Sequence, residues 1–261
     1  MQDLNTIQSS DNSDEGAQAW AIPFADMMTL LLTLFILLLV ILKESEKFVD
    51  RQINLLLQET YEQLDEKIKN DNVSIERVTK GIQVTLRGNL FESMKANVNK
   101  NYIPVIQEIS TIIEDCRLFN VEDSKQYSSL LTFLKDTNQE LNVEIRCEGH
   151  TDDAILPPQS NYRNNWELSS ARSLRVVNIM NDASSISEKY FSYNGYGEFR
   201  PLINVSGIDD FQKKKQARAY NRRVEIYLDA FARPKTRSSE AEFLKIMDEK
   251  FKKPEVISNQ N

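Results

Sequence analysis

The sequence predicts a single N-terminal transmembrane helix followed by an α/β domain. Residues 20–42 form an apolar run whose one charged side chain is Asp26. From residue 81 onward, alternating segments of the strand type are separated by segments with helical spacing, in the order βαβαβ-β. Such an order is typical of a mixed sheet with helices packed on it. The 261 residues leave room for one domain of ordinary size beside the membrane segment.

The N-terminal region divides into a tail and a membrane helix. Residues 1–19 are polar and acidic, so we expect a disordered tail. Residues 20–42 would form roughly 34 Å of helix, which is enough to cross a bilayer with some tilt. The run is too long for a cleavable signal peptide, and the charged sequence KESEK follows where small residues would be needed. We therefore expect the helix to stay attached.

Asp26 is the first candidate for a functional residue. A carboxylate at the centre of a membrane helix costs at least ~2.5 kcal/mol, so it usually pairs, takes up a proton or lines a water path. Thr29 and Thr33 follow on the same side of the helix. Their hydroxyls could support a hydrated ion path or could simply donate to helix carbonyls. Asp26 could also lie solvated at the membrane surface, close to the interfacial Trp20.

Residues 43–80 predict an amphipathic helical linker. Its apolar side chains recur at spacings of three and four, at Ile53, Leu57, Tyr61, Leu64 and Ile68. This stripe needs a partner, either the following domain or a second copy in a short parallel coiled coil. Basic residues follow the membrane segment and none precedes it, which by the positive-inside rule places the C-terminal side in the cytoplasm.

The domain covers residues 81–230. The patterns predict strands over 81–88, 143–149, 190–197 and 222–228, and helices over 102–113 and 166–180. Residues 115–140 are additional material with a turn at DTNQ. Residues 231–261 form a tail with one short amphipathic helix, whose apolar residues are Phe243, Ile246, Met247 and Phe251.

Composition argues against several functional classes. A net charge of −7 gives no support to nucleic-acid binding, and the cluster Lys213, Lys214, Lys215 and Arg218 suits a solvated surface. Two cysteines cannot make a disulfide framework, and Cys147 alternates with polar neighbours as a buried strand residue does. No GxSxG, HExxH or P-loop motif is present, so we expect neither an enzyme nor a cofactor.

A metal site is the alternative interpretation of the single histidine. His150 has Glu148, Asp152 and Asp153 nearby in the sequence. Zinc sites ordinarily need three or four protein ligands, mostly His and Cys, and successive strand residues point to opposite faces. We expect a structural histidine and no metal.

Three motifs in the domain resemble the OmpA-like peptidoglycan-binding family. They are GHTD at 149–152, LSSAR at 168–172 and NRRVE at 221–225. The resemblance implies a pocket for the diaminopimelate of the peptide stem, in which Asp152 pairs with the ammonium and Arg172 grips the carboxylate. It implies these binding residues: Thr151, Asp152, Asn165, Leu168, Ser169, Arg172, Asn221 and Arg222. Asp152 could instead cap a turn and Arg172 merely pair with it. The turn at 91–94 departs from the family pattern FxSG.

The membrane segment WAIPFADMMT resembles that of the MotB, PomB and ZorB group of motor subunits. The resemblance implies that Asp26 carries the coupling ion, H⁺ or alternatively Na⁺, with Thr29 and Thr33 beside it. The implied partners are a multi-pass MotA- or ZorA-like subunit in a five-to-two complex, a second copy as homodimer, and peptidoglycan. Because peptidoglycan lies outside the inner membrane, the N-terminus should be cytoplasmic and the domain periplasmic. This orientation is opposite to the one that the positive-inside rule predicts.

Two machines use such a subunit, the flagellar stator and the Zorya anti-phage defence complex. The acidic start, the short connection between residues 42 and 81 and the additional 115–140 segment favour a ZorB-like subunit. The motifs themselves resemble MotB. A third alternative is a tether that joins membrane to wall and conducts nothing. We also expect residues 43–70 to block ion flow until the wall is engaged.

Overall fold

The computed structural model describes residues 20–88, 90–92 and 94–235, and the chain divides into two compact units, residues 1–51 and 52–261. The predictions for residues 1–19 and for the tail from residue 236 onward concern residues outside those described. Helix α2 (Ala21–Lys67) begins in the first unit and ends in the second. It joins the predicted membrane and linker helices into one, because no Gly or Pro interrupts the sequence between them.

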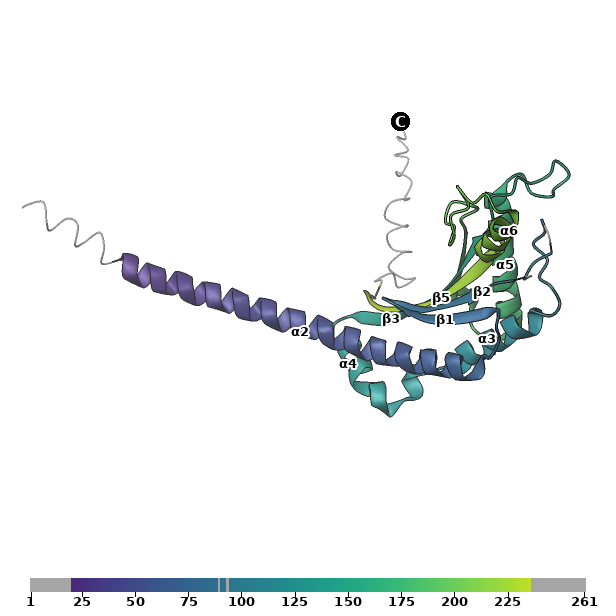
Figure 1. The fold of residues 1–261 in the computed structure, drawn as a ribbon. Helices are drawn as coiled ribbons and strands as arrows, with labels where there is room; N and C mark the ends of the chain where they lie inside the picture. Colours follow the sequence, from purple (N-terminus) through teal and green to yellow (C-terminus); the bar gives the residue numbers. More distant parts are fainter. Residues whose placement is uncertain (1–19, 89, 93, 236–261) are drawn as a thin grey trace, which may run out of the picture. The chain divides into compact units, whose positions relative to one another are not determined.

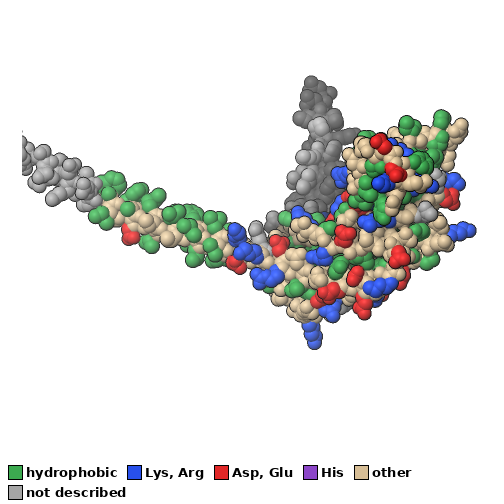
Figure 2. All heavy atoms as spheres, in the orientation of Figure 1, with side chains coloured by type: hydrophobic (Ala, Val, Ile, Leu, Met, Phe, Trp, Pro, Cys, Tyr) green, Lys and Arg blue, Asp and Glu red, His purple; other side chains and the backbone are tan. Residues whose placement is uncertain are grey.

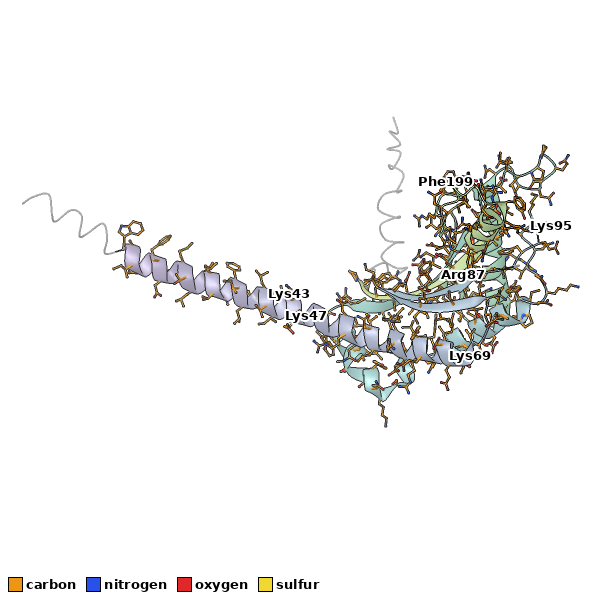
Figure 3. All side chains as sticks on the ribbon, in the orientation of Figure 1. Lys43, Lys47, Lys69, Arg87, Lys95 and Phe199 are labelled. Carbon is orange, nitrogen blue, oxygen red and sulfur yellow. The ribbon has the colours of Figure 1, made fainter. Side chains whose placement is uncertain are left out.

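The first unit is dominated by the apolar part of α2. Every described side chain from residue 20 to 44 is exposed, and hydrophobic side chains cover this part of the helix (Figure 2). The stretch is long and apolar enough to cross a membrane. Lys43 and Lys47 mark its end (Figure 3). A helix that is apolar on all sides needs lipid or partner helices around it.

The second unit is built on a mixed five-stranded sheet, which confirms the predicted fold class. The strand order is β1-β2-β5-β3-β4, in which β3 and β4 are parallel and the other pairs antiparallel. The strands are β1 (Val73–Val78), β2 (Gly81–Leu86), β3 (Gln139–His150), β4 (Phe191–Gly195) and β5 (Arg223–Pro234). Four of them correspond to predicted strands, whereas β1 was not predicted.

Helices cover one face of this sheet (Figure 1). Helix α5 packs on β3 and β4 and also against α3. The helices of this unit after α2 are α3 (Ile103–Asp115), α4 (Ser128–Asp136), α5 (Asn165–Ala183) and α6 (Phe211–Asn221). Of these, α3 and α5 were predicted. Buried side chains such as Ile145, Cys147 and Ile226 fill the space between sheet and helices. Both cysteines are free and buried, and burial was predicted for Cys147.

The C-terminal part of α2 packs on the domain. Ile53, Leu57, Leu64 and Ile68 of the predicted stripe are buried within the second unit, and Tyr61 is half-buried. Of the two partners considered for this stripe, the structure places it against the chain's own domain. Burial of four such side chains contributes about 1.5–3 kcal/mol each relative to exposure.

The additional segment 115–140 supplies part of that packing. It holds α4 and two short 3-10 turns, Val121–Asp123 and Lys125–Tyr127. Tyr127 is fully buried and donates its hydroxyl to Glu59 Oε1 of α2 at 3.0 Å. The predicted turn before β3 is present, with Asn138 in the left-handed region at φ 53°. The segment thus helps hold α2 on the domain.

Candidate functional site: a pocket at the ends of β3 and β5

A pocket of about 240 Å³ opens where β3 ends and β5 begins. It brings together six of the eight predicted binding residues: Thr151, Asp152, Asn165, Leu168, Arg172 and Arg222. The remaining lining residues are Gly88, Phe91, Met94, Ala154 and Leu156, which sequence reasoning missed. They lie in loops, where no hydrophobic period marks a residue as pocket-facing.

Strand register and helix geometry explain this convergence. His150 at the end of β3 pairs with Arg223 at the start of β5, so the residues just beyond them, Thr151 and Arg222, meet at one edge of the sheet. Helix α5 starts beside that edge, where the Asn164 side chain accepts a hydrogen bond from Glu167 N at 3.0 Å and caps the helix. Its residues 165, 168 and 172 share one face because their spacing is three and four.

Two glycines let α5 approach the sheet closely. Gly149 of β3 pairs with Gly195 of β4. A Cβ at Gly149 would lie 2.1 Å from the backbone oxygen of Ser169, and one at Gly195 would lie 2.4 Å from Ser170 N. Only residues without a side chain fit here. The motif glycine of GHTD therefore sets the position of the helix that carries Arg172.

Asp152 is paired with Arg222. Arg222 Nη1 lies 2.6 Å from Asp152 Oδ2, and Asp152 Oδ1 accepts from Ala154 N at 3.3 Å. The turn-capping alternative for Asp152 is thus observed together with its position in the pocket. The predicted alternative of an Arg172–Asp152 ion pair is not observed. Among the described residues, the ion-pair partner of Asp152 is Arg222.

Arg172 is the buried cation of the pocket. Its side chain is 3% exposed, its guanidinium lies 4.8 Å from the centroid of the Phe91 ring, and Nε donates to Lys95 O at 3.0 Å. Burial lowers the pKa of Arg172 to about 10, although the nearby Asp152 acts in the opposite direction. Among the described residues, its two terminal nitrogens have no hydrogen-bond partner. They are free to grip a ligand carboxylate.

Thr151 offers a second unsatisfied group. Its backbone N–H donates to Gly197 O at 2.9 Å, but its buried hydroxyl oxygen has no partner within the described part of the chain. A buried hydroxyl without a partner costs about 1–3 kcal/mol, which a ligand hydrogen bond would recover. The pocket therefore presents a cation, a hydroxyl and an Asp–Arg pair to a small ligand that carries both charges.

Two predicted binding residues are structural in this arrangement. The Ser169 hydroxyl accepts from Gly197 N at 2.9 Å and donates to Trp166 O at 3.0 Å. The Asn221 side chain accepts from Ile203 N at 2.9 Å and donates to Ile203 O at 2.8 Å. Both are buried and fix loops next to the pocket, and neither lines it.

Asp153 forms a neighbouring ion pair that sequence reasoning did not single out. Arg218 of α6 grips Asp153 through Nε at 2.6 Å and Nη2 at 2.9 Å. The hydrogen bond from Arg218 lowers the pKa of Asp153 below its usual range. This bidentate contact attaches α6 to the loop that follows β3. Arg218, one of the four residues of the basic cluster, is therefore paired with a carboxylate.

Of the acidic residues expected near the histidine, Glu148 lies close to it, and the other acidic neighbour is Glu225 of β5. Glu148, His150 and Glu225 place their potential ligand atoms within 4.8 Å of one another, all three buried. Arg146 donates to Glu148, however, and Arg223 Nε lies 2.5 Å from Glu225 Oε1. These arginines already compensate both carboxylates. The ring of His150 stacks on Tyr196 with centroids 5.5 Å apart.

The predicted ion-conducting residues lie on the exposed apolar part of α2. Thr29 Oγ1 donates to Asp26 O and Thr33 Oγ1 to Leu30 O, each at 2.8 Å. Of the two roles considered for the threonine hydroxyls, the structure shows the bonding to helix carbonyls. Asp26 is exposed, as are its neighbours along the helix.

Comparison with known proteins gives two family matches. Residues 7–54 match the model described as membrane MotB of the proton-channel complex MotA/MotB, and residues 90–215 match the OmpA family. Neither is a family of enzymes, so the expectation that the chain is not an enzyme is confirmed.

Two relatives from Bacillus subtilis (strain 168) are similar in sequence. Motility protein B is 25% identical over a matched region that covers 66% of this chain and 56% of the length of that protein. The protein designated Uncharacterized protein YtxE is 24% identical over 84% of this chain and 91% of its own length. The chain thus covers little more than half of the first relative.

A solved structure supports the fold. A MotB-like protein from Desulfovibrio vulgaris is 18% identical, with a TM-score of 0.50 over 72% of this chain and 99% of that one. At 18% identity, this structural similarity supports the fold and nothing further. The two family matches follow each other in the order that the sequence motifs predicted, so the chain is a MotB-like protein that joins a MotB-type membrane segment to an OmpA-family domain.

Proposed function

We propose that this chain is the wall-anchored B subunit of an ion-driven motor in the bacterial inner membrane. The domain would bind the peptide stem of peptidoglycan in the periplasm, with the N-terminus in the cytoplasm. The observation that carries the proposal is the pocket itself. Within the described residues, the terminal nitrogens of Arg172 and the hydroxyl of Thr151 have no hydrogen-bond partner, and they lie beside the Asp152–Arg222 pair. This is the chemistry that a diaminopimelate side chain, with one ammonium and one carboxylate, would satisfy.

The membrane half of the proposal rests on Asp26. It is the only charged side chain in the apolar stretch before Lys43, and the matched family model is that of a proton-channel complex. Asp26 would take up a proton from the periplasmic side and release it inward, with H⁺ as the proposed ion and Na⁺ as the alternative. The change in charge would alter which contact with a MotA- or ZorA-like ring is favoured. Two copies within a five-subunit ring complete the proposed assembly.

Anti-phage defence of the Zorya type is the process we propose for this motor. It is supported by the short connection, in which α2 runs on to Lys67 and packs on the domain, and by the additional 115–140 segment. Motility is the second candidate, since Motility protein B is among the relatives. Asp26→Asn in the native host, scored for both phage plaques and swimming, separates them: more plaques with normal swimming means defence, and lost swimming with unchanged plaques means motility. No change in either supports a passive tether.

Wall binding is tested by sedimentation of the full chain, in detergent, with purified peptidoglycan. We expect the double variant Asp152→Ala with Arg172→Ala to stay in the supernatant. Arg218→Ala, which breaks the neighbouring Asp153 pair outside the pocket lining, is the matched control and should sediment as the unaltered chain does. Unchanged sedimentation of the double variant would overturn the binding assignment.

A further inference from the structure

An exposed aromatic pair lies next to the pocket. The rings of Trp166 and Phe199 stack with centroids 5.2 Å apart and planes inclined by 27°. The two residues are nevertheless 48% and 62% exposed. Trp166 belongs to the first turn of α5, and Phe199 follows β4 and is seen at the surface (Figure 3). Large aromatic surface left in water is a common mark of a binding surface.

Hydrogen bonds connect this pair to the pocket. Asn165, which lines the pocket, donates to Glu198 Oε2 at 2.6 Å and to Ala154 O at 3.1 Å. Trp166 directly follows Asn165, and Phe199 directly follows Glu198. The contact that forms one wall of the pocket therefore also holds the aromatic pair beside it. A ligand that fills the pocket and extends past Asn165 would reach the two rings.

We propose that the Trp166–Phe199 pair is a subsite for a sugar ring of the glycan strand; this inference rests on the proposed function of the pocket. A pyranose ring has an apolar C–H face that can stack on an aromatic ring, and hydroxyls at its edge that need polar partners. Glu198 supplies such a partner, since its second carboxylate oxygen has no hydrogen bond among the described residues. Two stem residues and a lactyl group separate diaminopimelate from the sugar. This is at least about 10 Å at about 3.3–3.6 Å per unit, because the γ-linked glutamate is longer than an α-linked residue.

The test compares two soluble probes on the full chain in detergent. One is the stem tripeptide L-Ala-γ-D-Glu-meso-diaminopimelate, and the other is the same tripeptide carrying N-acetylmuramic acid. We expect the unaltered chain to bind the sugar-bearing probe about 3- to 10-fold more tightly, the range that one aromatic contact provides. Trp166→Ala and Phe199→Ala should each remove this preference while leaving affinity for the bare tripeptide unchanged.

A matched control and a direct optical signal sharpen the experiment. Phe231 is also exposed, but it lies eight residues along β5 from Arg223, about 26 Å at ~3.3 Å per residue. Phe231→Ala should therefore keep the preference. The chain has two tryptophans, so in a Trp20→Phe background the fluorescence of Trp166 reports the site alone. It should change with the sugar-bearing probe and not with the bare tripeptide.

Each contrary result has a distinct meaning. Equal affinity of the unaltered chain for both probes, with the tripeptide bound, overturns the sugar subsite and leaves the stem pocket standing. An equal loss of both affinities in Trp166→Ala assigns the pair to positioning Asn165 and also overturns the inference. Loss of self-association in Phe199→Ala with the preference intact would assign the surface to a second copy. Failure to bind either probe would overturn the proposed function itself.

Discussion

Arg222 Nη1 lies 2.6 Å from Asp152 Oδ2, whereas Arg172, the other cation of the same pocket, has no carboxylate partner within the described residues. The pocket thus contains one ion pair and one buried guanidinium that has no carboxylate partner in the described part of the chain. A ligand carboxylate can occupy the free side of Arg172 without breaking an existing pair. Arg222 therefore pairs with Asp152, and Arg172 is the arginine proposed to bind the ligand carboxylate.

Arg172→Lys should weaken binding of the stem tripeptide about tenfold or more. A lysine keeps the charge but cannot donate to Lys95 O and grip a carboxylate with two parallel hydrogen bonds at once. Hydrogen bonds to charged groups contribute about 1.5–3 kcal/mol, or roughly 10- to 150-fold in affinity. Titration calorimetry measures the change, and Arg218→Lys outside the pocket is the control. Equal affinity of Arg172→Lys and the unaltered chain would contradict the proposed grip.

The domain should lose stability in acid through Glu225. Burial alone would raise the pKa of Glu225, but hydrogen bonds bring it down to about 2. His150 Nε2 is 3.6 Å away, too far for a regular hydrogen bond, so we attribute the lowering to Arg223 at 2.5 Å and Tyr227 at 2.8 Å.

The sign of this effect follows from the two states. Because the folded pKa lies below the unfolded value of about 4.3, the stabilisation is complete above that value and is lost as the pH falls toward 2. We expect a loss of about 2–3 kcal/mol, followed as the midpoint of thermal unfolding between pH 6 and pH 2. Glu225→Gln should be less stable at pH 6 and should show a flatter acid limb. An acid limb of unchanged slope would contradict this role.

Gly149→Ala should damage both stability and binding. The new methyl group would meet the Ser169 carbonyl at 2.1 Å, so α5 must move away from the sheet and carry Arg172 and Leu168 with it. Overpacking of this kind costs about 1–3 kcal/mol or more. Gly207→Ala is the control, since no atom lies within 4 Å of its Cβ position and only the left-handed φ of 82° opposes it. It should lower the unfolding temperature without changing affinity for the tripeptide.

Tyr127→Phe tests the contact between α2 and the additional segment. The hydroxyl donates to Glu59 Oε1, and burial together with that carboxylate raises the pKa of Tyr127 to about 12. Removal of the hydroxyl should cost about 1–2 kcal/mol. Limited proteolysis near residue 59 should become faster, because α2 is held less firmly. Thr132→Val on the exposed side of α4 is the control, and equal cleavage rates in all three proteins would contradict the contact.

Periodicity and motifs predicted the parts of this fold that have a strong hydrophobic pattern. Strand β3, with alternating Val143, Ile145 and Cys147, and helix α5 were located correctly. Strand β1 was missed because its sequence VSIERV carries polar and charged residues at an edge of the sheet. Helix α6 was missed because its basic sequence FQKKKQARAYN has no apolar stripe.

The same limit applies to the pocket. Motif residues that end a strand or share a helix face, such as Asp152 and Arg172, could be placed together from sequence. Phe91 and Met94 could not, because a loop path decides which of its side chains turn inward. Ser169 and Asn221 belong to the same motifs as the binding residues, yet their hydrogen bonds serve neighbouring loops. Motif membership alone does not separate these two roles.

The placement of the pocket at one end of the β3–β5 pair has a mechanical consequence. These strands are each 12 residues long and are paired from Gln139–Pro234 to His150–Arg223. A ligand anchored to Asp152 and Arg222 would pull on both strands at the same end, along the longest ladder of the sheet. Because both strands would be pulled in the same direction and both lie inside the sheet, the load would neither separate them nor peel an edge strand bond by bond. The grip on the ligand should therefore fail under tension before the sheet does.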